Sequence, residues 1–506
     1  MTAIDPRTPC IIGVGAHTWH PDDVGEAGAP EPLDMWAHVA RLAEQDAGKP
    51  GLLAVLDSVQ IVYCQTWEYD DAVVRLAGAI GADPRHRHYS GIGGTTTQQL
   101  VSTTSEAMLR GEMDLALITS AEALATKRLR KRQGVRYAAS FPPPDRSPFP
   151  WESPPDPIEV AHEVFQAWLT FAVFDNARRG HLGTGLDSYR SGIGEMLAPM
   201  TRLAARNPHA WYRVERSAAE IADARPDNRM VGYPYTKYMV SVMDVDMAGA
   251  LLLATHERAE ALGVPHDRRV YPRGWCYALD PVLVAEHSDL WRSPAMAAAS
   301  GEALRIAGVS VDDVAFFDLY SCFASSLHFA CDALGISPND SRGLTVTGGL
   351  PYHGGPASGY LTHSIAEMVE RLRAAPDATG LVSGVGMHMT KHVYGVYSAV
   401  PGPVAPPDAS AVQAAVDAVG SPQVVAEHDG DATVGAYSVV HGRDGTPEWA
   451  LLVCDLPGGR RTYAQVRDAD HCAEAETTEL VGRNVTLAPK TVQGPMGEAK
   501  VNIATW

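Results

Sequence analysis

The chain has 506 residues, of which 45% are hydrophobic and 20% are charged, and its formal net charge is -19 at pH 7. This length suits two or three domains with sizeable cores, and the acidity disfavours nucleic acid or an anionic membrane as the main partner, because both would repel it. The seven scattered cysteines, none spaced as CxxC, indicate free thiols in a reducing compartment. The same cysteine spacing argues against a structural zinc site, and we expect no metal. Because there is neither a signal-peptide pattern nor a membrane-spanning apolar run, we expect a cytoplasmic protein.

The first 120 residues alternate between short apolar runs and amphipathic stretches. Strands are predicted at residues 10–14, 59–63 and 115–118, and helices at residues 35–43, 71–80 and 95–110. Strands that alternate with helices predict a parallel sheet covered on both faces.

This alternation stops between about residues 121 and 239. The stretch is rich in proline and contains a helical pattern with Phe165, Trp168, Phe171 and Phe174. It is too long for a plain loop, so we interpret it as an inserted lid whose aromatic side chains form a core. A basic cluster within residues 127–136 is interpreted as a solvated helix face, and contact with the phosphates of a cofactor is the alternative.

The alternation returns near residue 247 and ends near residue 385. Strands are predicted at residues 247–255, 270–279, 314–319, 345–347 and 381–385, and helices at residues 294–306, 323–334 and 361–372. The two stretches have similar outlines, which suggests an internal duplication.

The last hundred residues have a different composition. A proline-rich linker at residues 401–407 precedes a short helix at residues 411–419. Strands are then predicted at residues 433–440, 449–454, 462–466 and 483–487, and the first three are joined by the hairpin-like turns HGRDG and LPGG. A small antiparallel β-barrel or sandwich over about residues 422–506 accounts for this pattern.

Four loops carry small or reactive residues, the first just before a predicted helix and the other three at or after the ends of predicted strands. They are GGTT at residues 93–96, DLYSCF at 318–323, GGLPYHGGPASGY at 348–360 and SGVGMH at 383–388. Their order and the duplicated architecture make residues 8–400 resemble the thiolase superfamily, and the tail makes the whole chain similar to thiolase-like proteins with an additional C-terminal domain. In thiolases the matching loops are CxS with the nucleophilic cysteine, NEAF or HDCF, GHP with a histidine, and CxG with the acid/base cysteine.

The resemblance implies an α/β fold with a duplicated thiolase-type βαβαβαββ five-layered core, an inserted loop domain and a small OB-like C-terminal β-barrel. It places the N-terminal half at residues 1–265, with the insertion at about 121–239, and the C-terminal half at residues 266–400. The linker and short helix then cover residues 401–421, and the additional β-domain covers residues 422–506.

The resemblance also implies that the usual catalysts are replaced. Gly94 stands at the nucleophile, Gly355 at the GHP histidine and Gly384 at the second cysteine. Claisen condensation and thiolysis need a thiolate and a group that moves the α-proton. We therefore expect a protein of the acetyl-CoA acetyltransferase family that handles CoA or an acyl-CoA as its ligand but does not catalyse the standard reaction.

Several residues remain as candidates for chemistry or binding. The catalytic candidates are Tyr320, Cys322, Tyr352 and His353, and Cys322 is the retained cysteine of the HDCF loop. The residues expected to contact CoA are Gly94, Thr95, Thr96, Ser321, Gly354, Gly355, Gly384, Gly386 and His388. The GIGG run at residues 91–94 is read as a tight turn rather than a phosphate cradle.

Two alternative functions stay open. One is a CoA-dependent retro-aldolase, a lyase, in which Tyr320 and Tyr352 act as acid and base and the C-terminal domain replaces a partner protein. The other is a non-catalytic protein that binds CoA or an acyl-CoA. Acidic residues outnumber basic ones beyond residue 410, which disfavours nucleic-acid binding by the tail. The resemblance allows a homodimer, although the additional domain could block the sheet through which thiolases typically associate.

Overall fold

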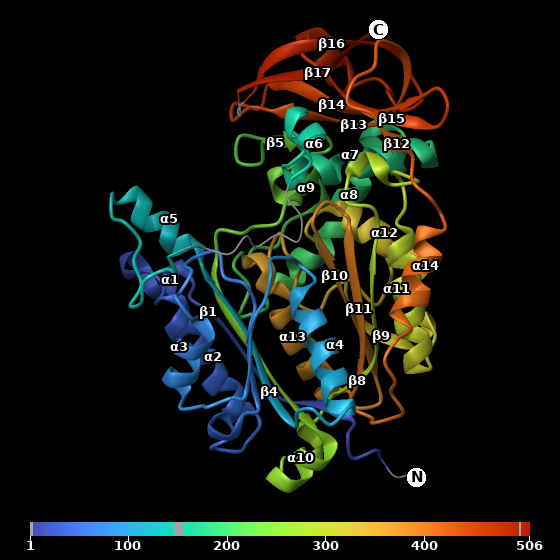
Figure 1. The fold of residues 1–506 in the computed structure, drawn as a ribbon. Coiled ribbons are helices and arrows are strands. Elements are labelled where there is room, and N and C mark those ends of the chain that lie inside the picture. Colours follow the sequence, from blue (N-terminus) through green and yellow to red (C-terminus); the bar gives the residue numbers. More distant parts are fainter. Residues whose placement is uncertain (1–3, 146–154, 495–496) are drawn as a thin grey trace.

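The computed structural model describes residues 4–145, 155–494 and 497–506. Two sheets and three layers of helices form its lower part, in the order helix, sheet, helix, sheet, helix (Figure 1). The outer helices of the first sheet are α2 (Pro32–Asp46) and α3 (Ala72–Ile80), and the central helices are α4 (Thr96–Leu109) and α13 (Tyr360–Ala374). On the far side lie α11 (Pro294–Ala307), α12 (Ala324–Leu334) and α14 (Ala409–Asp417). This is the five-layered core that the resemblance implies.

The first sheet has the strand order β1-β7-β4-β2-β3. Its strands are β1 (Pro9–Thr18), β2 (Ser58–Ile61), β3 (His86–Tyr89), β4 (Leu115–Ala123) and β7 (Asp246–Thr255). β2 is parallel to β3 and β4, whereas β7 is antiparallel to both β4 and β1. The expected all-parallel sheet is therefore wrong. The insertion leaves β4 and returns to β7 at the same end of the sheet, so β7 must run in the opposite direction.

The second sheet repeats this arrangement with the order β8-β11-β10-β9. Its strands are β8 (Tyr271–Leu279), β9 (Val314–Asp318), β10 (Thr379–Gly386) and β11 (Lys391–Ser398). A close helix contact is repeated as well. A Cβ atom on Gly15 of β1 would lie 2.3 Å from the carbonyl oxygen of Val39 in α2, and one on Gly274 of β8 would lie 2.2 Å from that of Ala303 in α11. Glycine at both places lets a helix approach its sheet closely, which supports the duplication.

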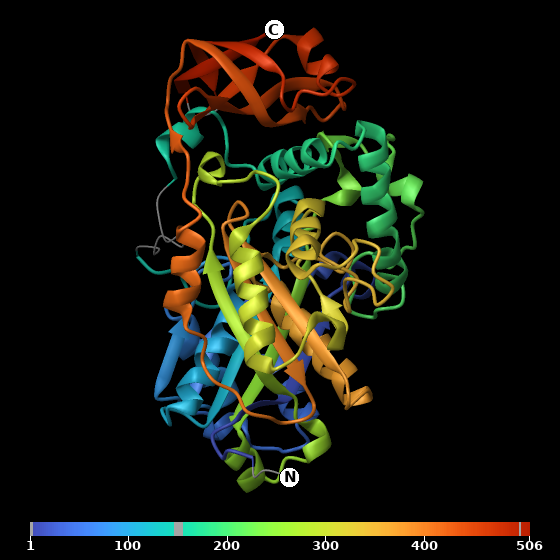
Figure 2. The same ribbon diagram turned by 90° about the vertical axis from the view of Figure 1, so that its right-hand side faces the viewer.

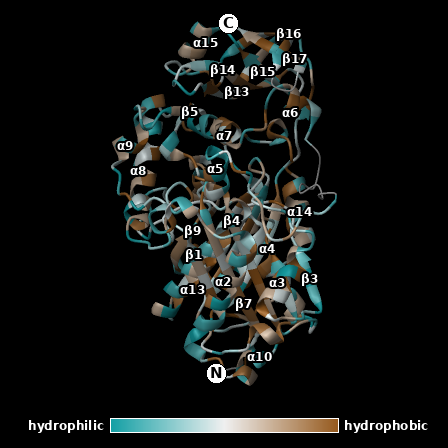
Figure 3. Cartoon of the chain, turned by 90° about the vertical axis from the view of Figure 1, so that its left-hand side faces the viewer, coloured by the Kyte–Doolittle hydropathy of each residue, from teal (hydrophilic) through white to brown (hydrophobic). Residues whose placement is uncertain are grey.

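The strand predicted at residues 345–347 does not form. One backbone hydrogen bond joins Leu319 N to Leu344 O at 2.9 Å, but the next amide, of Val346, donates to the carboxylate of Asp318 at 3.0 Å. A side chain thus takes the place of a strand neighbour. At the corresponding edge of the first sheet, β3 is the hydrophilic strand His-Arg-His-Tyr, which Figure 3 shows in teal beside the hydrophobic central strands.

The insertion is mostly helical. It contains α5 (Leu124–Arg132), α6 (Pro157–Ala161), α7 (Ala167–Leu182), α8 (Leu186–Ala204), α9 (Ala218–Ala222), β5 (Met230–Gly232) and β6 (Tyr235–Thr236). Phe171 and Phe174 of α7 are buried as expected, but Phe165 is exposed, because it precedes the helix. Most of the proline-rich segment, residues 146–154, lies outside the described residues. The short helices α1 (Pro21–Val24) and α10 (His256–Leu262) flank the core.

The C-terminal region is a closed five-stranded barrel. It comprises β13 (Gly430–His441), β14 (Pro447–Leu456), β15 (Arg460–Val466), β16 (Asn484–Gly494) and β17 (Gly497–Thr505), with α15 (Ala469–Glu474) and the short β12 (Gln423–Val424) beside it. The barrel lies above the insertion helices (Figure 2). β5 of the insertion pairs with β13 through Gly232 and Val440, so the barrel sheet continues into the insertion.

Buried polar contacts fix the barrel to α7 and α6. The fully buried Arg179 forms an ion pair with Glu479 of the barrel, and the side-chain amide of Asn176 donates to the carbonyl oxygen of Tyr437 at 2.9 Å. The hydroxyl of Tyr463 donates to Glu159 at 2.6 Å. Among the described residues, no helix combines the length and the apolar character needed to cross a bilayer.

Candidate functional site

The loop between β3 and α4 has no room for a side chain at its centre. A Cβ atom on Gly94 would lie 2.3 Å from the hydroxyl oxygen of Tyr320 and 2.2 Å from the backbone carbonyl oxygen of Val385. Both distances are far below van der Waals contact. The phenol of Tyr320 therefore fills the space in which a residue at position 94 would carry a nucleophile.

The first and fourth glycine-rich loops are in direct contact. A Cβ atom on Gly384 would lie 2.7 Å from the side chain of Leu361 and 3.0 Å from the carbonyl oxygen of Gly94. One on Gly386 would lie 3.6 Å from the hydroxyl of Thr95, which itself donates to Gln99 at 3.1 Å. Thr95 and Thr96 are buried at the start of α4. Gly94 and Gly384, the positions expected for the two thiols, are thus in contact, and no space for a side chain remains between them.

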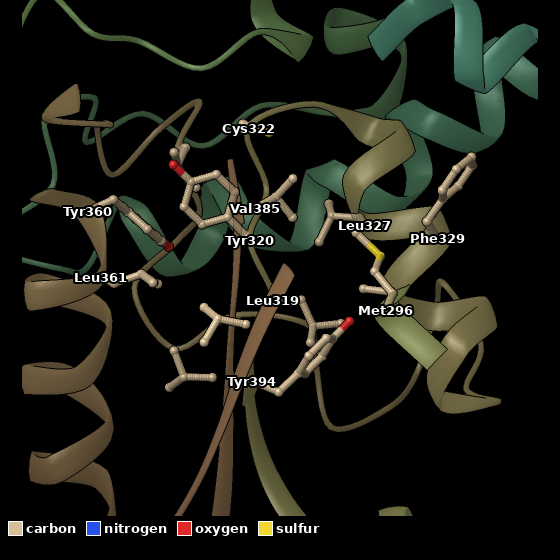
Figure 4. Packing of buried hydrophobic residues seen from close by; sticks show 14 of the residues in the cluster. Met296, Leu319, Tyr320, Cys322, Leu327, Phe329, Tyr360, Leu361, Val385 and Tyr394 are labelled. Atoms are coloured by element: carbon tan, nitrogen blue, oxygen red, sulfur yellow. The ribbon is translucent and has the colours of Figure 1, made fainter. Parts of the chain in front are cut away.

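Tyr320 is buried between α13 and the two loops. Figure 4 shows its ring with Tyr360 on one side and Val385 on the other. The rings of Tyr320 and Tyr360 meet edge to face with centres 5.6 Å apart, and the amide of Tyr320 donates to the hydroxyl of Ser383 at 2.9 Å. Burial raises the pKa of Tyr320 above its usual value, so the phenol stays protonated at neutral pH.

The second loop ties the site to the insertion. The carbonyl oxygen of Cys322 accepts a hydrogen bond from Ser241 N at 3.1 Å, and the hydroxyl of Ser321 accepts one from Leu350 N at 3.0 Å. The thiol of Cys322 is buried in the core, and this burial raises its pKa to about 12. Cys322 is consequently not an activated nucleophile in this environment.

The third loop packs against the insertion through its backbone. Gly355 N donates to the carbonyl oxygen of Val242 at 2.8 Å, and a Cβ atom on Gly355 would lie 3.1 Å from the side chain of Leu350. Gly354 has a φ of 108°, and a Cβ atom there would lie 2.8 Å from the sulfur of Met247. Further along, the hydroxyl of Ser358 accepts a hydrogen bond from Gly93 N at 3.0 Å, which joins this loop to the first.

The remaining candidates, Tyr352, His353 and His388, make their contacts with residues other than Gly94. Tyr352 is buried and its pKa is raised by burial, while its carbonyl oxygen accepts from Tyr212 N. His353 is buried against the rings of Tyr360 and His363, with centres 6.0 and 5.4 Å away. His388 lies in the turn between β10 and β11, where its Nδ1 atom is 2.8 Å from the hydroxyl of Thr170 in α7.

A cavity of about 950 Å³ opens beside these loops. We call it the insertion cavity. Its lining includes Ser241 and Val242, which bond to the second and third loops, and the rest comes from α1 with the residues after it and from the insertion, α5 included. The basic lining residues are Arg128, Arg132, Arg229 and Lys237, the aromatic ones are Trp168, Trp211 and Tyr212, and the acidic ones are Glu26, Asp244 and Asp246.

Two of the three acids in this cavity have partners among the described residues. Asp244 forms an ion pair with Arg128, and Asp246 accepts from the hydroxyl of Thr126 at 2.7 Å. Arg132 and Lys237 are exposed. The wall therefore presents cations and aromatic rings together.

Sequence reasoning noticed only part of this cavity. Arg128 and Arg132 belong to the basic cluster within residues 127–136, and both line the cavity. The alternative interpretation of this cluster, contact with phosphates, would therefore apply to a ligand in the cavity. Lys127 instead donates to the carbonyl oxygens of Gln65 and Thr66. Arg229, Lys237 and Trp211 were missed, because isolated residues in an irregular stretch give no pattern.

The comparisons with known proteins agree with this architecture. A crystal structure of a monomeric SCP2-thiolase-like protein type 1 from Mycobacterium smegmatis is 31% identical to the chain, covers 99% of it and 100% of its own length, and superposes with a TM-score of 0.86. The chain belongs to this family. The family model for the additional C-terminal domain of thiolase-like protein type 1 matches residues 411–490, within the barrel and the helix α14.

Two more distant structures share the fold. An acetyl-CoA acetyltransferase from Syntrophomonas wolfei is 13% identical, with 79% of this chain and 100% of that chain covered and a TM-score of 0.55. A chain of the Ltp2-ChsH2(DUF35) aldolase is 16% identical, with 77% and 98% covered and a TM-score of 0.58. No curated protein matches the chain in sequence.

Proposed function

We propose that this thiolase-like protein type 1 binds CoA or an acyl-CoA in the insertion cavity without forming an acyl-enzyme. The observation that carries the proposal is the cavity itself. Its volume of about 950 Å³ suits CoA or an acyl-CoA, and two of its lining residues, Ser241 and Val242, are bonded to the second and third loops.

The chemistry of the wall suits the nucleotide end of CoA. Arg132, Arg229 and Lys237 supply positive charge for phosphate oxygens. Trp168 and Trp211 offer ring faces on which an adenine can stack. The formal charge of the whole chain is -19, so a local group of cations in a concave site favours anionic ligands only there.

The closed loops argue against acyl transfer. Tyr320 occupies the space beside Gly94, and the buried thiol of Cys322 has a pKa of about 12. An acyl-enzyme needs an accessible nucleophile with a base beside it. Neither loop supplies one, so the ligand is held and released unchanged.

The retro-aldolase is the second candidate. It is favoured by the barrel docked in the same chain and by the fold shared with the Ltp2-ChsH2(DUF35) aldolase. Burial raises the pKa of both Tyr320 and Tyr352, which keeps both phenols protonated, makes them weaker acids and disfavours either as a general base. A lyase would need a base from another residue, so we place this function second.

Calorimetric titration with CoA, acetyl-CoA and free pantetheine tests the binding proposal. We expect CoA to bind with a dissociation constant in the micromolar range, and free pantetheine to bind at least about tenfold more weakly because it lacks the nucleotide phosphates. The double variant Arg132→Ala with Lys237→Ala should weaken CoA binding by about tenfold or more. Lys131→Ala, on the same helix but outside the cavity, is the matched control. Absence of CoA binding by the wild-type protein would refute the proposal.

We also propose that the protein is a monomer, as its relative from Mycobacterium smegmatis is described. The edge strand β3 carries three consecutive exposed residues, His86, Arg87 and His88. A charged, hydrophilic edge opposes pairing with a second sheet. Light scattering coupled to gel filtration should give the mass of one chain, and a mass of twice that value would exclude this proposal.

A further inference from the structure

A second cavity, of about 190 Å³, shares no lining residue with the insertion cavity and is lined by residues of β1 and α13. His353, His363, His209, Asn207, Glu367 and Glu370 provide its polar lining. His353 and His363 are each only 2% exposed. All four of their ring nitrogens lack a hydrogen-bond partner among the described residues. Buried polar atoms are normally paired, so this pair of imidazoles calls for a ligand.

We propose that this cavity binds a divalent transition-metal ion, with His353 and His363 as its first two ligands. The ring centres of the two histidines are 5.4 Å apart and the rings are inclined by 64°. Two imidazoles on one tetrahedral ion, with metal-nitrogen bonds of about 2 Å, have ring centres roughly 5 Å apart. The separation of the two rings is therefore compatible with a shared ion, and ion binding would require a ring nitrogen of each to turn toward it.

Glu367 is placed to supply the third ligand. It follows His363 by four residues on α13, so the two side chains lie on the same face of the helix. Its carboxylate now accepts from Arg371 at 3.2 Å. No three His, Cys, Asp or Glu side chains within the described ranges are already gathered as a complete metal site. Binding must therefore rotate Glu367 from Arg371 toward the histidines, or leave the remaining positions to water.

The chemistry of the donors selects the ion. Neutral imidazole with carboxylate suits Zn²⁺, Co²⁺ or Ni²⁺ rather than Mg²⁺ or Ca²⁺, which prefer oxygen ligands. The expectation from the cysteine spacing, that the chain holds no metal, considered thiolate sites. It could not detect two histidines that are separated by a loop and a helix start.

The experiment uses the full chain without an affinity tag, treated with a chelator and then titrated with CoCl₂ and with ZnCl₂. We expect one equivalent of Co²⁺ to bind with the visible absorption of a four- or five-coordinate ion, and Zn²⁺ to raise the melting temperature by several degrees. His353→Gln and His363→Gln should each weaken binding at least about tenfold. His38→Gln, which removes an exposed histidine beside His17, should leave it unchanged.

Other outcomes overturn the proposal. The first is that the wild-type protein shows no saturable metal binding. The second is that metal binding survives both His353→Gln and His363→Gln but is lost in His38→Gln, which would indicate a surface site at His17 and His38. X-ray absorption of the Zn²⁺-loaded wild-type protein needs no variant, and fewer than two imidazole ligands in that spectrum would also overturn it. CoA binding is measured separately, so failure here leaves the proposed function intact.

Discussion

The hydroxyl of Tyr320 lies 2.3 Å from the position that a Cβ atom on Gly94 would take. The two residues are 226 positions apart and belong to different halves of the core, yet the phenol of Tyr320 leaves no room for a side chain at Gly94. Gly94 is thus required by Tyr320, and not only by the turn before α4.

Gly94→Ala should therefore destabilise the protein by about 1–3 kcal/mol, the usual cost of overpacking a core. Chemical denaturation measures this loss. Removing the phenol with Tyr320→Ala should reduce the additional cost of Gly94→Ala in the double variant, although the Val385 carbonyl oxygen at 2.2 Å keeps part of it.

The matched control is Gly301→Ala in α11. A Cβ atom on Gly301 meets nothing within 4 Å, so alanine should leave stability unchanged or raise it through helix propensity. Equal stabilities of Gly94→Ala and the wild-type protein would contradict the packing described here.

Incubation with acetyl-CoA should leave the intact mass of the protein unchanged. With a pKa of about 12 for Cys322, roughly one thiol in ten thousand is ionised at pH 8. An adduct of one acetyl group that disappears in Cys322→Ala would show that this thiol acts as a nucleophile.

Glu159 should make stability depend on pH. Burial raises the pKa of this carboxyl from 4.5 to about 7, so its ionised form costs folding energy. This cost lowers the free energy of unfolding. It is absent below pH 4.5, grows as the pH rises and reaches its maximum of about 3 kcal/mol above pH 7.

Glu159→Gln keeps an acceptor for Tyr463 and Val284 but cannot ionise. Its free energy of unfolding, relative to the wild-type protein, should therefore increase from pH 5 to pH 8. Urea denaturation at both values measures the difference, with the exposed Glu448→Gln as control. A constant difference would show that Glu159 does not carry this cost.

Glu479→Gln should loosen the barrel from α7. The guanidinium of Arg179 is fully buried and forms its ion pair with Glu479, and the hydroxyl of Tyr437 accepts a further bond at 3.3 Å. Glu479 is 41% exposed, so we expect a loss of about 2 kcal/mol, below the usual cost of breaking a fully buried pair. Guanidinium denaturation with barrel tryptophan fluorescence measures it. Unchanged stability would mean that Asn176 and Tyr463 suffice for docking.

Most of the fold could be predicted from the sequence, because buried strands such as β7 are continuous apolar runs and amphipathic helices such as α13 have a clear periodicity. β3, β11 and β17 were among the strands missed. The hydrophilic β3 lies at a sheet edge, β11 begins with Lys391 and His392 and is interrupted by Gly395, and β17 alternates weakly. The segment at residues 345–347 looked like a strand because its residues have high strand propensity. Its amides bond to Asp318, which local patterns cannot show.

The candidate site was less predictable. The loops around Gly94 and Gly384 were found because clustered glycines stand out, before a helix in the first and at the end of a strand in the second. Their contact with each other, and the position of Tyr320 between the halves, depend on how distant elements pack. His353 was noticed as a loop histidine, whereas His363 was hidden in a helix and only the fold brings the two rings together.

The pairing of β5 with β13 makes the barrel a permanent neighbour of the insertion. Where such a domain is a separate protein, the fraction of core domains that carry it depends on protein concentration and falls on dilution. Here the encounter is intramolecular, so the effective concentration of the barrel is set by the chain alone. Any property of the insertion cavity that depends on the barrel should therefore be the same at nanomolar and at micromolar protein.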